Sequence, residues 1–204
     1  MRITQWVLKH YPKLAIIAGE RVSGTMMSEF AFTVPETVTF EEAIALTQSI
    51  LDKMQAGELS PDAIAAAISE LVKTKNGARG FFVNYLTSES TIADNPSQEV
   101  VQALQLNPDT VSELLVKNLA MSAGMAITHR RNDNHQMAEG SDRVRSRTAR
   151  IIELVKLPQV YQQAKSLLES AITGEGEYKS FLAKWGYDAE QRQVISQELQ
   201  QILN

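Results

Sequence analysis

Four arginines near the middle of the sequence have the charge and the spacing to bind an anionic ligand. On a helix with about 100° per residue, Arg143, Arg147 and Arg150 fall on one flank, and Arg130 precedes them. A guanidinium is always charged and offers a planar fork of donors that suits carboxylates and phosphates. The pattern predicts either a site for a phosphate-bearing ligand or ion pairs with acids on a neighbouring helix. We favour the ion pairs, because the protein as a whole is acidic.

A second candidate is a set of polar side chains on an otherwise apolar helix. Asn118, Ser122 and His129 fall on the side that Val111 and Leu115 dominate. Buried polar groups without a hydrogen-bond partner cost roughly 1–3 kcal/mol each. These residues therefore either bond to one another, to backbone or to water and fix the position of the helix, or they line a small polar pocket. We favour the first interpretation.

Four residues have side chains of the types that bind metal ions: His129, Asp133, His135 and Glu139. In an unbroken helix they would form two i, i+4 pairs, but these pairs would point about 120° apart, and the Asn-Asp-Asn sequence at 132–134 is typical of a break. The chain contains no cysteine, which excludes disulfides, thiolate catalysis and zinc–thiolate sites. We expect no metal and no cofactor.

The motifs that usually accompany catalysis are missing from the sequence. It has no glycine-rich phosphate-binding loop, no HExxH, no EF-hand loop, no nucleophile elbow and no paired-carboxylate di-iron pattern. RNA binding would favour aromatic residues among the basic ones, and the segment 130–150 contains none. We assign no catalytic residue and expect the protein not to be an enzyme.

Two long helices must position the arginines and the polar side chains. The first is predicted over 108–129 and the second over 135–156, with a joint at 131–134. The first helix is apolar around most of its circumference, so other helices must surround it. The sequence therefore predicts an all-α fold, a bundle of about eight to ten helices around a buried central helix near residues 108–129.

Capping residues mark where the other helices begin and end. The sequence Thr39-Phe-Glu-Glu42 is a capping box, and Asp188 with Gln191 forms a similar pair. Ser60-Pro61 starts another helix. Gly57 suits a left-handed cap, and the Asn-Gly pair at 76–77 is predicted to stop a helix.

The two ends of the chain are predicted separately. Short helices are expected over 3–10 and 12–30, and residues 30–40 are either a short strand or, as we favour, an extended connector. Residues 1–173 are expected to form the main bundle. Gly174-Glu-Gly176 is typical of a linker, and 177–204 is predicted to be a helical hairpin that docks on the bundle or binds a partner.

One stretch resembles part of a known enzyme family. Residues 42–51, EAIALTQSIL, followed by 57–64, GELSPDAI, resemble the helical N-terminal domain of anthranilate phosphoribosyltransferases and related phosphorylases. The resemblance covers a small part of the chain and implies a helical segment. The glycine-rich diphosphate-binding motif of the larger domain of those enzymes is absent here. No activity or functional residue is therefore transferred.

The overall charge limits the classes of partner. The chain has a formal net charge of −4 over 204 residues, which makes nucleic acid and anionic lipid unfavourable partners. The apolar run Leu14–Ala18 is too short for a signal peptide or a membrane span. We expect a cytoplasmic protein that does not enter a membrane.

Three classes of function remain, in this order. The first is a non-enzymatic interaction or regulatory protein that uses a helical surface such as 177–204 to bind a protein partner or another copy of itself. The second is a module that binds an anionic ligand, or less readily nucleic acid, through the four arginines. The third is an enzyme with a pocket at Asn118, Ser122 and His129. The enzyme is last because no catalytic motif supports it.

Overall fold

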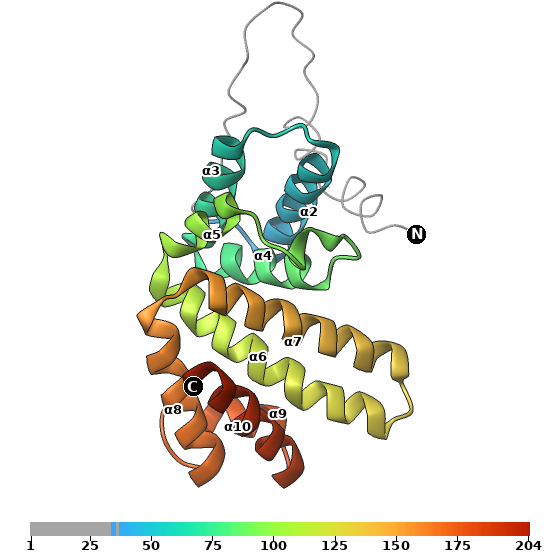
Figure 1. The fold of residues 1–204 in the computed structure, drawn as a ribbon, viewed down its shortest axis with the longest axis vertical. Coiled ribbons are helices and arrows are strands. Elements are labelled where there is room, and N and C mark those ends of the chain that lie inside the picture. The colour runs from blue at the N-terminus through green and yellow to red at the C-terminus, as the bar shows by residue number, and fades with distance from the viewer. Residues whose placement is uncertain (1–33, 36) are drawn as a thin grey trace, which may run out of the picture.

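The computed structural model describes residues 34–35 and 37–204, and these residues form nine α-helices, one short 3₁₀ helix and no strand (Figure 1). The predicted all-α fold is thereby confirmed. The helices expected over 3–10 and 12–30, and part of 30–40, lie outside the described residues. In chain order the elements are α2 (Phe40–Ala56), α3 (Pro61–Val72), α4 (Lys75–Thr87), η2 (Thr91–Ala93), α5 (Gln98–Gln105), α6 (Pro108–Arg131), α7 (His135–Val155), α8 (Pro158–Thr173), α9 (Lys179–Trp185) and α10 (Ala189–Leu203).

The helices are arranged in three tiers, with the long antiparallel pair α6–α7 in the middle (Figure 1). Helices α2 to α5 lie on one side of this pair, and α8 to α10 lie on the other. Helix α6 packs most extensively on α7 and also contacts α10, α8, α4 and α5. The prediction of a buried central helix near 108–129 is therefore confirmed, because α6 has neighbours on most of its circumference. None of the described helices is both long and apolar enough to cross a bilayer.

One continuous apolar core runs through all three tiers. It includes Phe81 and Tyr85 of α4, Leu115 of α6 and Leu199 of α10, each with no exposed surface. Helices α2 and α4 approach closely, because a Cβ on Gly80 would lie only 2.5 Å from that of Ala43. The glycine therefore sets the distance between these two helices.

Most of the predicted helix caps are present. The capping box of Thr39 and Glu42 begins α2, and a second one, formed by Asp188 and Gln191, begins α10. Ser60 caps α3 by accepting a hydrogen bond from the amide of Ala63. Helix α2 ends at Gly57, whose φ of 68° is the left-handed conformation that glycine favours. These ends follow from local chemistry, which is why the sequence predicts them.

The predicted helix stop at residues 76–77 is wrong. Both residues lie in the first turn of α4, which begins after Thr74, and the Thr74 hydroxyl accepts a hydrogen bond from the amide of Gly77. A Cβ on Gly77 would lie 1.9 Å from the carbonyl oxygen of Leu71. The glycine is there because α4 starts directly against the end of α3, not because a helix ends in the left-handed conformation.

The C-terminal helices α9 and α10 pack against the rest of the bundle. Helix α10 contacts α8 and α6, and a Cβ on Gly124 of α6 would lie 2.6 Å from the ring of Tyr187. The Gln191 amide nitrogen donates to the carbonyl of Gly124 and to the hydroxyl of Thr128, both at 2.9 Å. Arg131 forms ion pairs with Asp188 and Glu190 at the start of α10. The division into 1–173 and 177–204 stays a prediction.

Met137 differs from its expected place. The apolar residues Met137, Val144, Ile151 and Val155 recur at helical spacing, which predicts all four on the buried side of the second long helix, but 52% of the surface of Met137 is exposed. It lies in the first turn of α7, at the end of the α6–α7 pair that projects beyond the neighbouring helices (Figure 1). The next residue of this set, Val144, lies two turns further along α7 and packs against the core.

Candidate functional site

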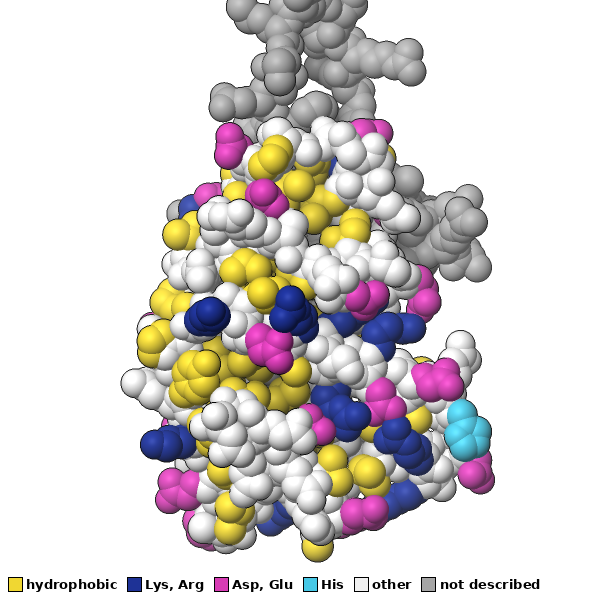
Figure 2. Space-filling model, in the orientation of Figure 1, with side chains coloured by type: hydrophobic (Ala, Val, Ile, Leu, Met, Phe, Trp, Pro, Cys, Tyr) yellow, Lys and Arg dark blue, Asp and Glu magenta, His cyan; other side chains and the backbone are white. Residues whose placement is uncertain are grey.

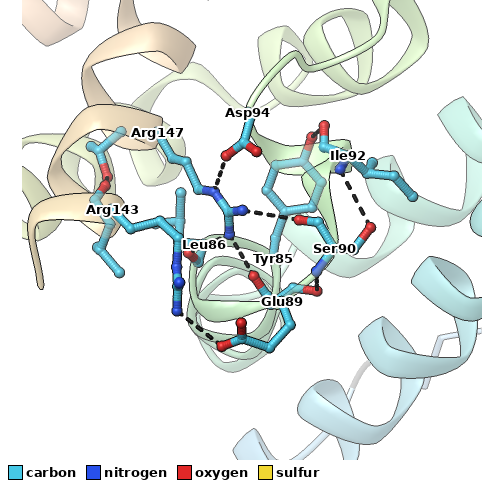
Figure 3. Close-up of polar contacts among 11 residues, drawn as sticks. Tyr85, Leu86, Glu89, Ser90, Ile92, Asp94, Arg143 and Arg147 are labelled. Atoms are coloured by element: carbon cyan, nitrogen blue, oxygen red, sulfur yellow. Dashed lines mark hydrogen bonds and ion pairs between the residues drawn. The ribbon is translucent and has the colours of Figure 1, made fainter. Parts of the chain in front are cut away.

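Arg147 is the most deeply buried of the predicted site residues. Its side chain is 3% exposed and reaches from α7 into the connection between α4 and α5 (Figure 3). Nε donates to the Asp94 carboxylate at 2.7 Å, and Nη1 donates to the carbonyls of Leu86 and Ser88 at 3.0 and 2.7 Å. Nη2 donates to the carbonyl of Ser90 at 2.9 Å.

These bonds give Arg147 a structural role. Leu86 and Ser88 lie at the end of α4, where carbonyls have no partner within the helix. The guanidinium satisfies them and at the same time neutralises Asp94. Burial also raises the pKa of Tyr85 beside this cluster, and the positive charge of Arg147 partly opposes that rise. The fork of donors is directed into the protein and has little capacity left for a ligand.

The other three predicted arginines lie on the surface, each beside an acid. Arg143 donates to the carboxylate of Glu89 at 3.0 Å, and Arg150 pairs with Glu153 one turn further along α7. Arg130 pairs with Asp142. On the face that Figure 2 draws, basic and acidic side chains are intermixed rather than gathered by sign. These pairs weigh against a phosphate site, and the ligand-binding assignment of the four arginines stays a prediction.

The polar side chains of α6 do not converge on a common cavity. Ser122 is buried, and its hydroxyl donates to the carbonyls of Asn118 and Leu119 in its own helix, at 2.7 and 3.0 Å. The side chains of Asn118 and His129 are half-buried and form no hydrogen bond with another described residue. The two hollows described below are lined by other residues. The enzyme hypothesis therefore gains no geometric support here.

The described residues contain no group of three or more histidines, aspartates or glutamates placed to hold a metal ion. His129 and His135 lie on either side of the joint, the first within α6 and the second at the start of α7. Asp133 lies between them in a left-handed conformation, with φ of 53°. The backbone reverses direction at this point, so the four residues considered from the sequence do not share a helical face.

A hollow of about 630 Å³ lies between the C-terminal end of α8 and one face of α10. We call it the α8–α10 groove. Its walls include Ala171 and Ile172 of α8 and, on α10, Ala189, Arg192, Gln193, Ser196 and Gln200. Ile172 is 66% exposed, which is unusual for a side chain of its size. The groove thus combines an exposed apolar residue with amide and hydroxyl groups.

Among the described residues, Arg192 is the only charged side chain that lines the α8–α10 groove. It is half-buried, and its Nε donates to the backbone carbonyl of Tyr187 at 3.1 Å. No carboxylate of the described residues lies within ion-pair distance of it. It differs in this respect from every arginine of α6 and α7, each of which has an acidic partner.

A second, smaller hollow of about 320 Å³ lies between α6, α8 and α9. Lys117 stands over the rings of Tyr178 and Phe181, with Nζ 5.7 and 5.8 Å from the two ring centres, and it also pairs with Glu113. Burial raises the pKa of Tyr178, and the nearby charges of Glu177 and Glu113 add to the rise. Since Lys117 already occupies the aromatic faces, this hollow offers a ligand less than the α8–α10 groove does.

A protein family described as "Uncharacterised conserved protein UCP020893" matches residues 39–202. The chain belongs to this family. The match extends from the capping box of α2 to the last turn of α10, and so covers every described helix. Comparisons with curated proteins and with solved structures give no match. The family description names no activity, so a function must be argued from the molecule itself.

The α8–α10 groove was not among the predicted sites, although part of it can be read from the sequence. Ala189, Gln193, Ser196 and Gln200 recur at helical spacing and form an uncharged face, which is separate from the apolar face of Ile195, Leu199 and Ile202. In a chain with 24 acidic residues, a helix face without charge is a sequence feature that could have indicated a binding surface. That Arg192 has no acidic partner depends on the packing of α8 against α10, and no sequence pattern shows it.

Proposed function

We propose that this protein is a non-enzymatic interaction module that binds a partner protein in the α8–α10 groove. The observation that carries the proposal is the pairing of Ile172, two-thirds exposed, with Arg192, half-buried and without an acid, in one hollow. An apolar anchor beside a polar rim is the usual composition of a protein-binding surface.

The residues that first suggested chemistry support this proposal indirectly. Arg147 and Ser122 donate their hydrogen bonds to backbone and side-chain acceptors inside the bundle. Their polarity is therefore explained by folding. The α8–α10 groove is different, because the side-chain amides of Gln193 and Gln200 and the terminal nitrogens of Arg192 form no hydrogen bond with another described residue.

The groove is shaped for a short segment of a partner. Arg192 and Gln200 are eight residues apart, which at 1.5 Å per residue places them about 12 Å apart along α10. This length accommodates about two turns of a helix laid against α8 and α10, a common mode of recognition. Since all 204 residues include no cysteine, a cytoplasmic partner fits the reducing chemistry of that compartment.

The experiment uses the full chain with Ile172→Ser, which removes the apolar anchor and adds no charge. Tagged wild type and variant are used to capture proteins from cells of the organism that makes this chain. The captured partner is then purified and titrated by calorimetry. We expect Ile172→Ser to weaken binding at least tenfold.

Leu106→Ser is the matched control, because Leu106 is 68% exposed and lies at the end of α5, in a different tier of the bundle. It should bind the partner as wild type does. Equal binding by Ile172→Ser and wild type would contradict the proposal. So would light scattering that shows self-association dependent on Ile172, because the groove would then join two copies of this chain.

A further inference from the structure

We infer that the α8–α10 groove recognises an acidic side chain on its partner, in a segment where an aspartate or glutamate lies about one turn from an apolar residue. This inference rests on the proposed function and adds the chemistry of the partner to it. Arg192 would bind the carboxylate, and Ile172 would contact the apolar residue.

One hydrogen bond holds the guanidinium of Arg192 in place, and its other N–H donors are not used by any described residue. The bond from its Nε to the Tyr187 carbonyl, at 3.1 Å, fixes one edge of the guanidinium. The two terminal nitrogens have no hydrogen-bond partner among the described residues. A Cβ on Gly174 would lie 3.6 Å from Nη1, so the charged group sits beside the residue that ends α8. The negative end of the α8 dipole makes this position favourable for a cation, but it supplies no counter-charge of a full unit.

The acids that could have neutralised Arg192 are engaged elsewhere. Asp188 and Glu190, at the start of α10, pair with Arg131 of α6. Glu198 pairs with Arg145 of α7. These contacts turn the acidic side chains of α10 toward the α6–α7 pair and leave the groove with one unopposed positive charge. A partly buried cation of this kind is stabilised by an incoming anion.

A carboxylate suits this groove better than a phosphate does. A phosphorylated side chain carries a charge of about −1.5 to −2 at neutral pH, whereas the groove offers a single cation within a protein of net charge −4. One carboxylate matches one guanidinium, and the planar fork can bind both of its oxygens. The exposed Ile172 favours an apolar residue in the partner segment, and the amides of Gln193 and Gln200 favour uncharged polar residues around it.

The test begins with a selection that assumes no partner. A phage library of random 16-residue peptides is selected on the full wild-type chain and, in parallel, on Arg192→Gln. We expect aspartate or glutamate next to apolar residues to be enriched on wild type and not on the variant. The strongest acidic peptide is then synthesised with its acid unchanged, with the amide in its place, and with phosphoserine in its place.

Fluorescence anisotropy measures how each peptide binds. The amide peptide should bind wild type at least tenfold more weakly than the acidic peptide, and Arg192→Gln should remove that difference. Arg79→Gln is the matched control, because Arg79 also has no carboxylate partner among the described residues but lies exposed on α4, over the ring of Phe40. It removes the same charge and should leave the tenfold preference intact.

Four outcomes would overturn the inference: no enrichment of acids, equal binding of the acidic and amide peptides, a loss with Arg79→Gln as large as that with Arg192→Gln, or tighter binding of the phosphoserine peptide. Ile172→Ser separates this failure from that of the proposed function. If Ile172→Ser abolishes peptide binding while the acidic and amide peptides bind wild type equally, the groove binds proteins but Arg192 does not bind a carboxylate of the partner. If the peptides bind Ile172→Ser normally, the groove is not the binding site and both proposals fail.

Discussion

The Nε of Arg147 donates to the carboxylate of Asp94 across 2.7 Å, although the two residues are 53 positions apart in the chain. The contact joins the middle of α7 to the connection between α4 and α5 (Figure 3). The same guanidinium also donates to three backbone carbonyls, at the end of α4 and in that connection. Arg147 therefore links the first tier of helices to the central pair.

Arg147→Met should strongly destabilise the protein. The substitution keeps much of the side-chain volume but leaves Asp94 and the carbonyls of Leu86, Ser88 and Ser90 without their donor. Asp94 is 43% exposed, so water can solvate its carboxylate in the variant. The main cost therefore comes from the carbonyls, at about 1–3 kcal/mol for a buried acceptor that is left without a donor. Urea unfolding followed by circular dichroism gives the free energy of unfolding directly.

Arg150→Met is the matched control for this prediction. Arg150 lies on the same flank of α7, but it is exposed and its pair with Glu153 is one turn away in the same helix. Such pairs contribute about 0.3–0.5 kcal/mol. If the two substitutions lowered the stability by similar amounts, the structural role assigned to Arg147 would be wrong.

The arginines show where sequence reasoning stops. Their spacing correctly places Arg143, Arg147 and Arg150 on one flank of a helix, and it favours ion pairs. It does not distinguish Arg147, which is buried, from Arg150, which is exposed, because that difference depends on a connection 53 residues upstream. Helical periodicity describes one element at a time, whereas burial is decided by the element that packs against it.

The helix boundaries show the converse. The starts of α2, α3 and α10 can be predicted because a capping side chain accepts a hydrogen bond from the amide three residues further along the chain. The Asn-Gly pair at 76–77 leads to a wrong prediction because it, too, is interpreted from local sequence alone. A glycine is typical of a helix end, but Gly77 is required by the close approach of Leu71, and only the packed structure shows that contact.

Gly124→Ala should destabilise the protein although alanine is the better helix former. The new Cβ would lie 2.6 Å from the ring of Tyr187, which is only 4% exposed and has little room to move. Overpacking of this kind costs about 1–3 kcal/mol, more than the gain of up to about 1 kcal/mol in helix propensity. Thermal unfolding of the variant should show a lower midpoint.

Gly140→Ala is the counterpart within α7. A Cβ at this position would meet nothing within 4 Å. Only the propensity term remains, so this variant should be more stable than wild type by up to about 1 kcal/mol. Opposite signs for the two glycines would support the close contact of α6 with Tyr187, and a stabilised Gly124→Ala would refute it.

Two buried tyrosines should respond in opposite ways when the hydroxyl is removed. The hydroxyl of Tyr187 is buried without a hydrogen-bond partner among the described residues, whereas that of Tyr85 donates to the carbonyl of Ile92 at 3.3 Å. Tyr187→Phe should therefore leave the stability unchanged or raise it by about 1 kcal/mol, because an unpaired polar group is no longer buried. Tyr85→Phe should lower it by about 1 kcal/mol. Urea unfolding of both variants decides, and a loss in Tyr187→Phe as large as in Tyr85→Phe would show that the Tyr187 hydroxyl has a partner.

The contact between α6 and α10 should also be visible as a pH effect. The hydrogen bond from Arg131 lowers the pKa of Asp188 below its ordinary value of 3.8, and the backbone bond from Gln191 lowers it further. A carboxylate whose pKa is lower in the folded state stabilises that state above its ordinary pKa, and this contribution is lost as the pH falls through the lowered value. Arg131→Gln should raise the pKa of Asp188 toward 3.8 without reaching it, because the bond from Gln191 remains.

Carbon-13 NMR of the Asp188 carboxyl group measures this pKa in wild type and in the variant. Arg150→Gln removes an equal charge from α7 without touching Asp188, and it should leave the pKa in place. The stability advantage of wild type over Arg131→Gln should also shrink as the pH falls below 3.8, and it should disappear once the pH is below the lowered pKa of wild type, because Asp188 is then protonated in both proteins. An unchanged pKa in Arg131→Gln would mean that Arg131 does not hold the start of α10 in solution, and the attachment of α10 would then depend on Gln191 and on the packing of Tyr187 against Gly124.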